Sequence, residues 1–179
     1  MNYVFIDIEA TCWRNWRNEN LMETIEIGAV KLNHHLEIID EFVSLIRPVI
    51  EPELSDFCMR LTSIQQEDVD QADTFVTVFD RFVKWLGKEP FTWYSWGGFD
   101  RVQLQRDCRK FDRPWPAPLD NHVNFKKLFA EQQQLEEPMG MMRALRRLNI
   151  EHNGSHHRAL DDARHIAQIA QMIMAQETD

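Results

Sequence analysis

The chain has 179 residues, of which 44% are hydrophobic and 27% are charged, and its formal net charge is −9. This size suits one domain with a single substantial core, so we expect residues 1–179 to form one domain, and the composition argues against disorder. No apolar run approaches the ~18 residues of a transmembrane helix. The negative charge argues against a protein that holds nucleic acid by bulk electrostatics, but not against an enzyme whose metal ions neutralise its own acids.

The N-terminus enters an apolar run directly, without the basic region, apolar region and cleavage site of a secretory signal. We therefore expect a cytoplasmic location and no membrane association. The cysteines are Cys12, Cys58 and Cys108, which are widely spaced and form no CxxC arrangement. We interpret them as reduced packing residues.

Residues 1–11 form a short apolar run that is interrupted by Asp7 and Glu9. The run predicts a buried strand, in which side chains two positions apart point to the same face, ~7 Å from one another. Two buried carboxylates are unfavourable unless they protonate, meet cations or hold metal, and the run contains no Lys or Arg. The pair is consistent with a metal site and equally with the solvent-facing end of an ordinary strand.

The next elements follow from periodicity and turn signals. Residues 12–20 are typical of a loop, and residues 23–32 and 36–46 alternate as two strands of an antiparallel hairpin that extends the first strand. A short helix is predicted over 54–60. A second helix is expected to begin after Ser63, which has Gln66 three residues later as in a capping box.

The second half alternates strands with helices, which predicts an α/β domain with a mixed central sheet flanked by helices. An amphipathic helix over 74–86 precedes a strand over 91–96, which is closed by two glycines. We then expect, in chain order, a helix over 100–111, a strand over 122–125, a helix up to about 134, and helices over 139–148 and 159–174.

Two further acid sites lie at element ends. Asp100 follows the strand and its Gly-Gly turn, where the alternative role is a helix N-cap. His156, His157, Asp161 and Asp162 open the last helix, where a general base and a metal ligand compete with a surface His pair beside capping aspartates. Capping does not explain why separate acid sites recur at element ends within one domain.

Taken together, residues 7–11 (DIEAT), 96–100 (WGGFD) and 157–163 (HRALDDA) resemble, in order, the three motifs of the DEDDh 3′–5′ exonucleases. The resemblance spans nearly the whole chain. Residues 5–12 (FIDIEATC) and 61–64 (LTSI) are most similar to the Eri-type branch, whose members trim RNA. The resemblance implies an RNase H-like fold and hydrolysis of phosphodiesters from the 3′ end to nucleoside 5′-monophosphates.

The resemblance also implies the roles of individual residues. His157 would be the general base, and the ligands of two Mg²⁺ or Mn²⁺ ions would be Asp7, Glu9, Asp100 and Asp162. The spacing within the last motif selects His157 over His156 and Asp162 over Asp161. Carboxylate oxygens suit such hard cations, and two ions can stabilise the attacking and leaving oxygens of an in-line displacement.

The expected substrate is the 3′ end of single-stranded RNA or DNA, with RNA favoured. The resemblance implies that Ala10 and Thr11 contact the 3′-terminal nucleotide and that Leu61 and Thr62 lie near its base. In the loop, stacking and phosphate contacts compete with plain solvation for Trp13, Trp16, Arg14 and Arg17. Arg143, Arg146 and Arg147 lie at helical spacing on one face, which is either a track for phosphates or a solvent-exposed face without a partner.

Two other functions are compatible with parts of this pattern. A non-catalytic nucleic-acid or protein-binding module would keep the fold but not the reaction. A helical metal phosphohydrolase of the HD kind would also place His and Asp pairs together, but such a domain is all helical. The oligomeric state is left open by the sequence.

Overall fold

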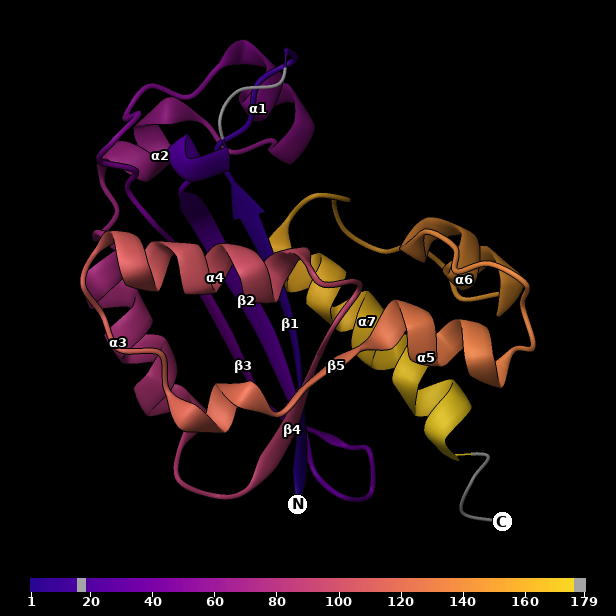
Figure 1. Cartoon of the computed structure of the whole chain (residues 1–179). Helices are drawn as coiled ribbons and strands as arrows, with labels where there is room; N and C mark the ends of the chain where they lie inside the picture. The colour runs from indigo at the N-terminus through magenta and orange to yellow at the C-terminus, as the bar shows by residue number, and fades with distance from the viewer. Residues whose placement is uncertain (16–18, 176–179) are drawn as a thin grey trace.

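The computed structural model describes residues 1–15 and 19–175, and within them five strands form one mixed sheet in the order β3-β2-β1-β4-β5 (Figure 1). The strands are β1 (Asn2–Ala10), β2 (Thr24–Leu32), β3 (Ile38–Leu45), β4 (Phe91–Ser95) and β5 (His122–Asn124). The β1–β2 and β2–β3 pairs are antiparallel, whereas β1–β4 and β4–β5 are parallel. The predicted hairpin and the mixed sheet are confirmed.

Helices flank this sheet on both faces, which excludes the all-helical alternative. The helices are α1 (Asp56–Thr62), α2 (Gln66–Asp70), α3 (Phe75–Leu86), α4 (Phe99–Lys110), α5 (Phe125–Gln132), α6 (Met141–Arg147) and α7 (Ala159–Met174), with 3₁₀ turns η1 (Glu19–Leu21) and η2 (Ala117–Asp120). In Figure 1, α3 and α4 lie on one side of the strands, α5, α6 and α7 on the other, and α1 and α2 beyond one end. None of the helices described is long and apolar enough to cross a membrane.

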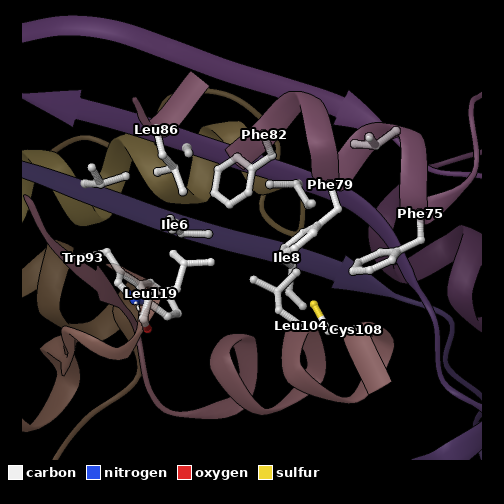
Figure 2. Packing of buried hydrophobic residues seen from close by; sticks show 14 of the residues in the cluster. Ile6, Ile8, Phe75, Phe79, Phe82, Leu86, Trp93, Leu104, Cys108 and Leu119 are labelled. Atoms are coloured by element: carbon white, nitrogen blue, oxygen red, sulfur yellow. Dashed lines mark hydrogen bonds between the residues drawn. The ribbon is translucent and has the colours of Figure 1, made fainter. Parts of the chain in front are cut away.

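The face toward α3 and α4 carries the aromatic core (Figure 2). Ile6 and Ile8 project from β1 into this layer, where they belong to one buried cluster with Phe79 and Phe82 of α3 and Leu104 of α4. The aromatic residues of α3 recur at three- and four-residue intervals, so one side of the helix is apolar. The predicted amphipathic helix is confirmed, and its aromatic stripe is core.

The opposite face of β1 packs under α7, and it is the face that carries the acids. Phe5 is buried there with Phe125, and Asp7 and Glu9 follow at two-residue steps on the same side. The helix lies unusually close to the sheet at Gly28 of β2, the register partner of Asp7. A Cβ at Gly28 would lie 2.1 Å from the backbone of Ala159, so only glycine lets the start of α7 reach this position.

The predicted capping box at Ser63 is wrong. Ser55 is the N-cap that begins α1, since its side chain accepts the Cys58 N–H, and the helix therefore runs two residues further than predicted. Ser63 ends that helix in a left-handed conformation with φ 61°, and the cap of α2 is Gln65 instead. The other predicted elements are present with ends shifted by one or two residues at most.

Candidate active site

A cavity of about 300 Å³ opens where β1, α4 and α7 meet. Its lining includes every residue expected as a metal ligand or general base, and the full set is Asp7, Ile8, Glu9, Trp96, Phe99, Asp100, Met141, His156, His157 and Asp162. The first and last of these residues, Asp7 and Asp162, are more than 150 positions apart in the sequence. The sheet and the starts of two helices therefore bring the three separate motifs to one place.

Asp100 is positioned by a gap beside β1. The parallel pairing of β1 with β4 ends at Phe5 and Tyr94, and β1 continues alone beyond that point. The Ile8 N–H donates instead to Asp100 Oδ1 at 3.2 Å. Asp100 is the second residue of α4, and Gly98 is the N-cap, so simple helix capping does not explain this aspartate.

Asp162 reaches the same cavity from the first turn of α7. Its Oδ2 accepts the backbone N–H of His157 at 3.0 Å and lies 3.1 Å from Nδ1 of His156. Nδ1 of His165, one turn further along the helix, lies 3.8 Å from Oδ1. Asp162 is therefore held in place by groups from its own helix and from the loop before it.

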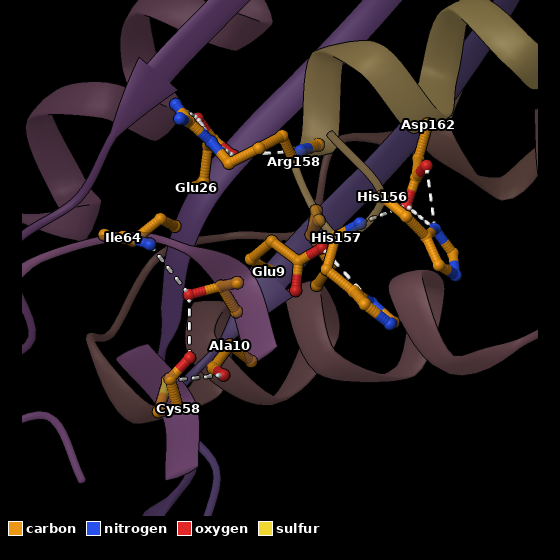
Figure 3. A network of polar contacts seen from close by, with 12 residues as sticks. Glu9, Ala10, Glu26, Cys58, Ile64, His156, His157, Arg158 and Asp162 are labelled. Carbon is orange, nitrogen blue, oxygen red and sulfur yellow. Dashed lines mark hydrogen bonds and ion pairs between the residues drawn. The ribbon is translucent and has the colours of Figure 1, made fainter. Parts of the chain in front are cut away.

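That loop is held by Glu26, which the sequence analysis did not single out (Figure 3). Glu26 is 1% exposed and lies opposite Glu9 in the β1–β2 register. It accepts hydrogen bonds from Nη2 of Arg158 at 2.8 Å and from the Ala159 N–H at 2.9 Å. A carboxylate at this place accepts a backbone N–H that the first turn of α7 leaves free, and it holds the loop that carries His157. The available signal was an acid at an inward position of an alternating strand.

The cavity collects negative charge without a basic counterpart, since neither Lys nor Arg appears among the described residues that line it. Burial, and then the charges of Asp100 and Asp162, raises the pKa of Asp7 well above its usual value. Burial, and then the charges of Asp162 and Glu26, raises the pKa of Glu9 to about 8. Burial also raises the pKa of Asp100 to about 6. These acids repel one another unless a cation joins them.

Asp162 behaves differently from the other acids. Burial acts to raise its pKa, but the neighbouring imidazoles of His165 and His156 and the N–H of His157 outweigh that effect, and the pKa lies below the usual value. Hydrogen bonds to the ionised form favour it. Asp162 is therefore the carboxylate that the protein itself keeps charged.

His157 occupies a left-handed backbone conformation, with φ 65°, at the turn into α7. Its Nδ1 lies 4.0 Å from Glu9 Oε1, and its ring stacks on that of His156 with centroids 3.9 Å apart. Burial, followed by the neighbouring His156, lowers the pKa of His157. A neutral imidazole at pH 7 has a free nitrogen that can take a proton. Both histidines line the cavity, so the choice of His157 stays a prediction.

His165 is a second residue that the sequence analysis missed. It is 2% exposed, and its Nε2 accepts the Asn153 N–H at 3.2 Å. A neutral imidazole that accepts at Nε2 carries its proton on Nδ1, the atom that faces Asp162. The N–H of His165 therefore points toward the Asp162 carboxylate, but at 3.8 Å it is beyond hydrogen-bond distance and Nδ1 has no hydrogen-bond partner among the described residues. His152, Asp162 and His165 also place potential ligand atoms within 4.8 Å of one another.

The donor set fits divalent metal. Carboxylate oxygens of Asp7, Glu9 and Asp162 lie within 4.8 Å of one another. Hard divalent cations bind such oxygens, and their charge offsets the repulsion that raises the pKa values on β1. The arrangement of these carboxylates is therefore suited to binding divalent metal.

Most of the residues expected to touch the terminal nucleotide are buried, and only Leu61 is exposed. Thr11 is buried, and its hydroxyl accepts the Glu23 N–H at 3.0 Å. Thr62 is fully buried, and its hydroxyl donates to the Cys58 carbonyl at 2.9 Å. Leu61 is 37% exposed, whereas Ala10 is buried. Contact of these residues with a nucleotide stays a prediction.

Trp13 and Arg14 line a different cavity, of about 380 Å³, beside α1. It shares none of its lining residues with the acid cavity. Trp16 and Arg17 lie outside the described residues. The structure thus brings together the acids and histidines of the three motifs but does not place Trp13 or Arg14 among them.

A family model described as "Exonuclease" (RNase_T) matches residues 4–170. The chain belongs to this exonuclease family. It is 35% identical over 174 residues to the 3′-5′ exoribonuclease 1 of Mus musculus, covering 92% of this chain and 50% of that protein. It is 31% identical over 193 residues to the ERI1 exoribonuclease 2 of Homo sapiens, covering 93% of this chain and 27% of that one.

Solved structures agree with this assignment. The nuclease domain of 3′hExo, a DEDDh family member bound to rAMP, superposes with a TM-score of 0.91 at 31% identity, covering 98% of this chain and 92% of that one. The expected RNase H-like fold and the resemblance to Eri-type DEDDh exonucleases are confirmed. DEDDh exonucleases depend on divalent metal. The chain spans about half the length of the exoribonuclease 1 relatives it matches.

Proposed function

We propose that this chain is a metal-dependent 3′–5′ exonuclease that releases nucleoside 5′-monophosphates from single-stranded nucleic acid, RNA more readily than DNA. The observation that carries the proposal is the convergence of Asp7, Glu9, Asp100 and Asp162 beside His157 in one cavity. The naming of the relatives as exoribonucleases supports RNA as the substrate class. We propose residues 1–179 as a single exonuclease domain.

The carboxylates are proposed to hold two divalent ions, Mg²⁺ or Mn²⁺. Two such ions, when bound, stabilise the attacking and leaving oxygens of an in-line displacement at phosphorus. The raised pKa values of Asp7 and Glu9 support this assignment, because no Lys or Arg lines the cavity among the residues that the structure describes. Asp162, kept ionised by its own donors, supplies a ligand that needs no deprotonation.

His157 is proposed as the general base. Its lowered pKa leaves the imidazole neutral, so one ring nitrogen can accept the proton of an attacking water. The φ of 65° at this residue puts its N–H on Asp162 and leaves the ring free to face Glu9. His156 instead places Nδ1 on Asp162, which supports the choice of His157.

The nucleotide is proposed to bind along the edge of the cavity nearest α1. Ala10 and Thr11 continue β1 past Glu9, and Leu61 presents an exposed apolar side chain from α1. Thr62 would support Leu61 from beneath, since its own side chain is internal. Stacking by Trp13 and a phosphate contact by Arg14 are proposed for nucleotides beyond the terminal one. The cytoplasmic location stays a prediction.

The test is degradation of matched RNA and DNA oligomers with a 5′ label, in Mg²⁺ and in Mn²⁺. We expect products that shorten from the 3′ end one nucleotide at a time, release of 5′-mononucleotides, and complete loss of activity with a chelator. Full activity of Asp7→Ala or Asp162→Ala would sink the mechanism. Metal-dependent binding without turnover of any 3′ end would favour the non-catalytic binding module instead.

A further inference from the structure

Helix α6 carries a basic surface beside the active site, defined here as the α6 face of Arg143, Arg146 and Arg147. These positions are three and four residues apart and exposed, whereas Met141, Ala144 and Leu145 on the other side of the helix are buried. The arginines, together with Met139, surround a cavity of about 530 Å³. The apolar side packs into the core under α7, so the orientation of the basic side is set by packing.

The α6 face lacks the acidic partners that most other described arginines have. Most other arginines of the described chain pair with carboxylates, including Arg158 with Glu26 and Arg164 with Glu41, and Arg14, Arg47 and Arg109 are the exceptions. Within the described residues, no carboxylate lies within ion-pair distance of Arg143, Arg146 or Arg147: Arg146 Nε donates to the Met142 carbonyl, and Arg147 Nε lies 3.5 Å from Gln133 Oε1. In a chain of net charge −9, unpaired cations collected on one helix face have their guanidinium groups available for an anionic ligand.

The cavity of the α6 face adjoins the active-site cavity. Met141, at the start of α6, lines the acid cavity, and Met139, two residues earlier, lines the basic one. Trp96 also lines the acid cavity, and its Nε1 donates to the Met139 carbonyl at 3.1 Å. At ~1.5 Å of rise per residue, Arg147 lies about 9 Å further along the helix axis than Met141. The arginines thus lead away from the site where the 3′ end is expected.

We propose that the α6 face binds the phosphates of the nucleotides upstream of the 3′-terminal one, so that a single strand leaves the active site over α6. This inference rests on the proposed exonuclease function and adds the path of the substrate. The ligand class is a single-stranded polynucleotide at least a few nucleotides long. Arginine holds phosphate through its paired N–H groups without reading the base, so the track is independent of sequence.

The test compares the double variant Arg143→Gln/Arg147→Gln with the wild type on two substrates in the preferred sugar series. A dinucleotide has only the scissile phosphate and ends before the α6 face of three arginines, whereas an unstructured 20-mer of oligouridine or oligothymidine can reach that face. We expect unchanged kcat/KM on the dinucleotide and about ten-fold lower kcat/KM on the 20-mer at ~0.1 M salt. The salt slope of binding should flatten by about 1.4, that is ~0.7 for each lost phosphate contact.

Lys84→Gln/Lys88→Gln is the matched control, because it removes the same charge from exposed positions in and just after α3, on the other side of the sheet. This control should act like the wild type on both substrates. An equal loss on dinucleotide and 20-mer, no loss on either, or the same loss in the control would overturn the track. Anisotropy of a labelled 20-mer in a chelator measures binding without catalysis. If the wild type hydrolyses neither substrate, the proposed function fails, while binding that is weakened only in the α6 variant still supports the track.

Discussion

Asp7 and Glu9 on β1 and Asp162 on α7 face one cavity, but their surroundings differ. The β1 acids are buried among other acids, and their pKa values are raised. Asp162 accepts from the loop and helix around it, and its pKa is lowered. A bound cation would favour the charged form of the acids on the strand side, whereas the protein itself already favours the charged form on the helix side. The α7 half of the site is thus prepared for metal by the protein, whereas the β1 half is stabilised in its charged form only when metal binds.

The largest expected effect comes from removing one acid from each half. Asp7→Asn and Asp162→Asn should each lower kcat by about 10³-fold or more, because each removes a metal ligand. Without metal, however, the melting temperatures should move in opposite directions. Asp7→Asn relieves repulsion and raises it, while Asp162→Asn weakens charge-assisted hydrogen bonds and lowers it. Thermal denaturation in a chelator checks this, and shifts of the same sign would contradict the comparison.

The second effect concerns the contact that joins the two halves. Gly28→Ala should push the start of α7 away from β2, because its Cβ would lie 2.1 Å from the Ala159 backbone. We expect a loss of about 1–3 kcal/mol in unfolding free energy and about 10² in kcat/KM. Denaturant unfolding and oligomer degradation measure the two. Ala29→Gly, the next residue of β2, is the control for a changed strand residue, since it should cost stability through packing but spare the α7 contact.

A smaller effect should follow from changing His165, whose Nδ1 faces Asp162 at 3.8 Å. His165→Phe keeps a ring to stack on His152 but removes the N–H that faces the carboxylate. We expect about ten-fold more Mg²⁺ or Mn²⁺ for half-maximal activity, because groups behind a ligand tune metal affinity. His165→Gln, which retains a side-chain N–H, should lie closer to the wild type. If both variants differ only in melting temperature and not in metal dependence, His165 is merely a core residue.

The last prediction concerns stability alone, as a function of pH. The folded pKa of Glu9 is about 8 against an ordinary 4.5, and that of Asp100 is about 6 against 3.8. The folded chain then binds more protons than the unfolded chain, so metal-free stability falls as pH rises from about 5 to 8, by up to ~1.4 kcal/mol per pH unit for each titrating group. Saturating Mg²⁺ should reduce this fall. Asp162 works in the opposite direction, and its contribution is lost as pH falls below 3.8.

Short-range pattern was enough to predict most elements but not their detailed ends. The amphipathic helix α3 was recognisable because it buries one side in a regular period, and β2 was recognisable from its alternating sequence although all of its residues are buried. Ser63 was assigned to the wrong helix end, since a serine followed by Gln66 suits a cap, while Ser55 had already started the preceding helix. Several polar side chains can start a helix, and the choice among them depends on packing.

The sequence by itself determined the chemistry of the site. Asp7 and Glu9 had to share a face because strand side chains alternate, and the ordered motifs identified the partners Asp100, His157 and Asp162. Only the tertiary structure decided how these groups are held. Glu26, His165 and Gly28 act through contacts between segments distant in sequence, and such contacts leave no local period. The opposite pKa shifts of Glu9 and Asp162 likewise arise from burial and neighbours, which exist only once the sheet and α7 have packed together.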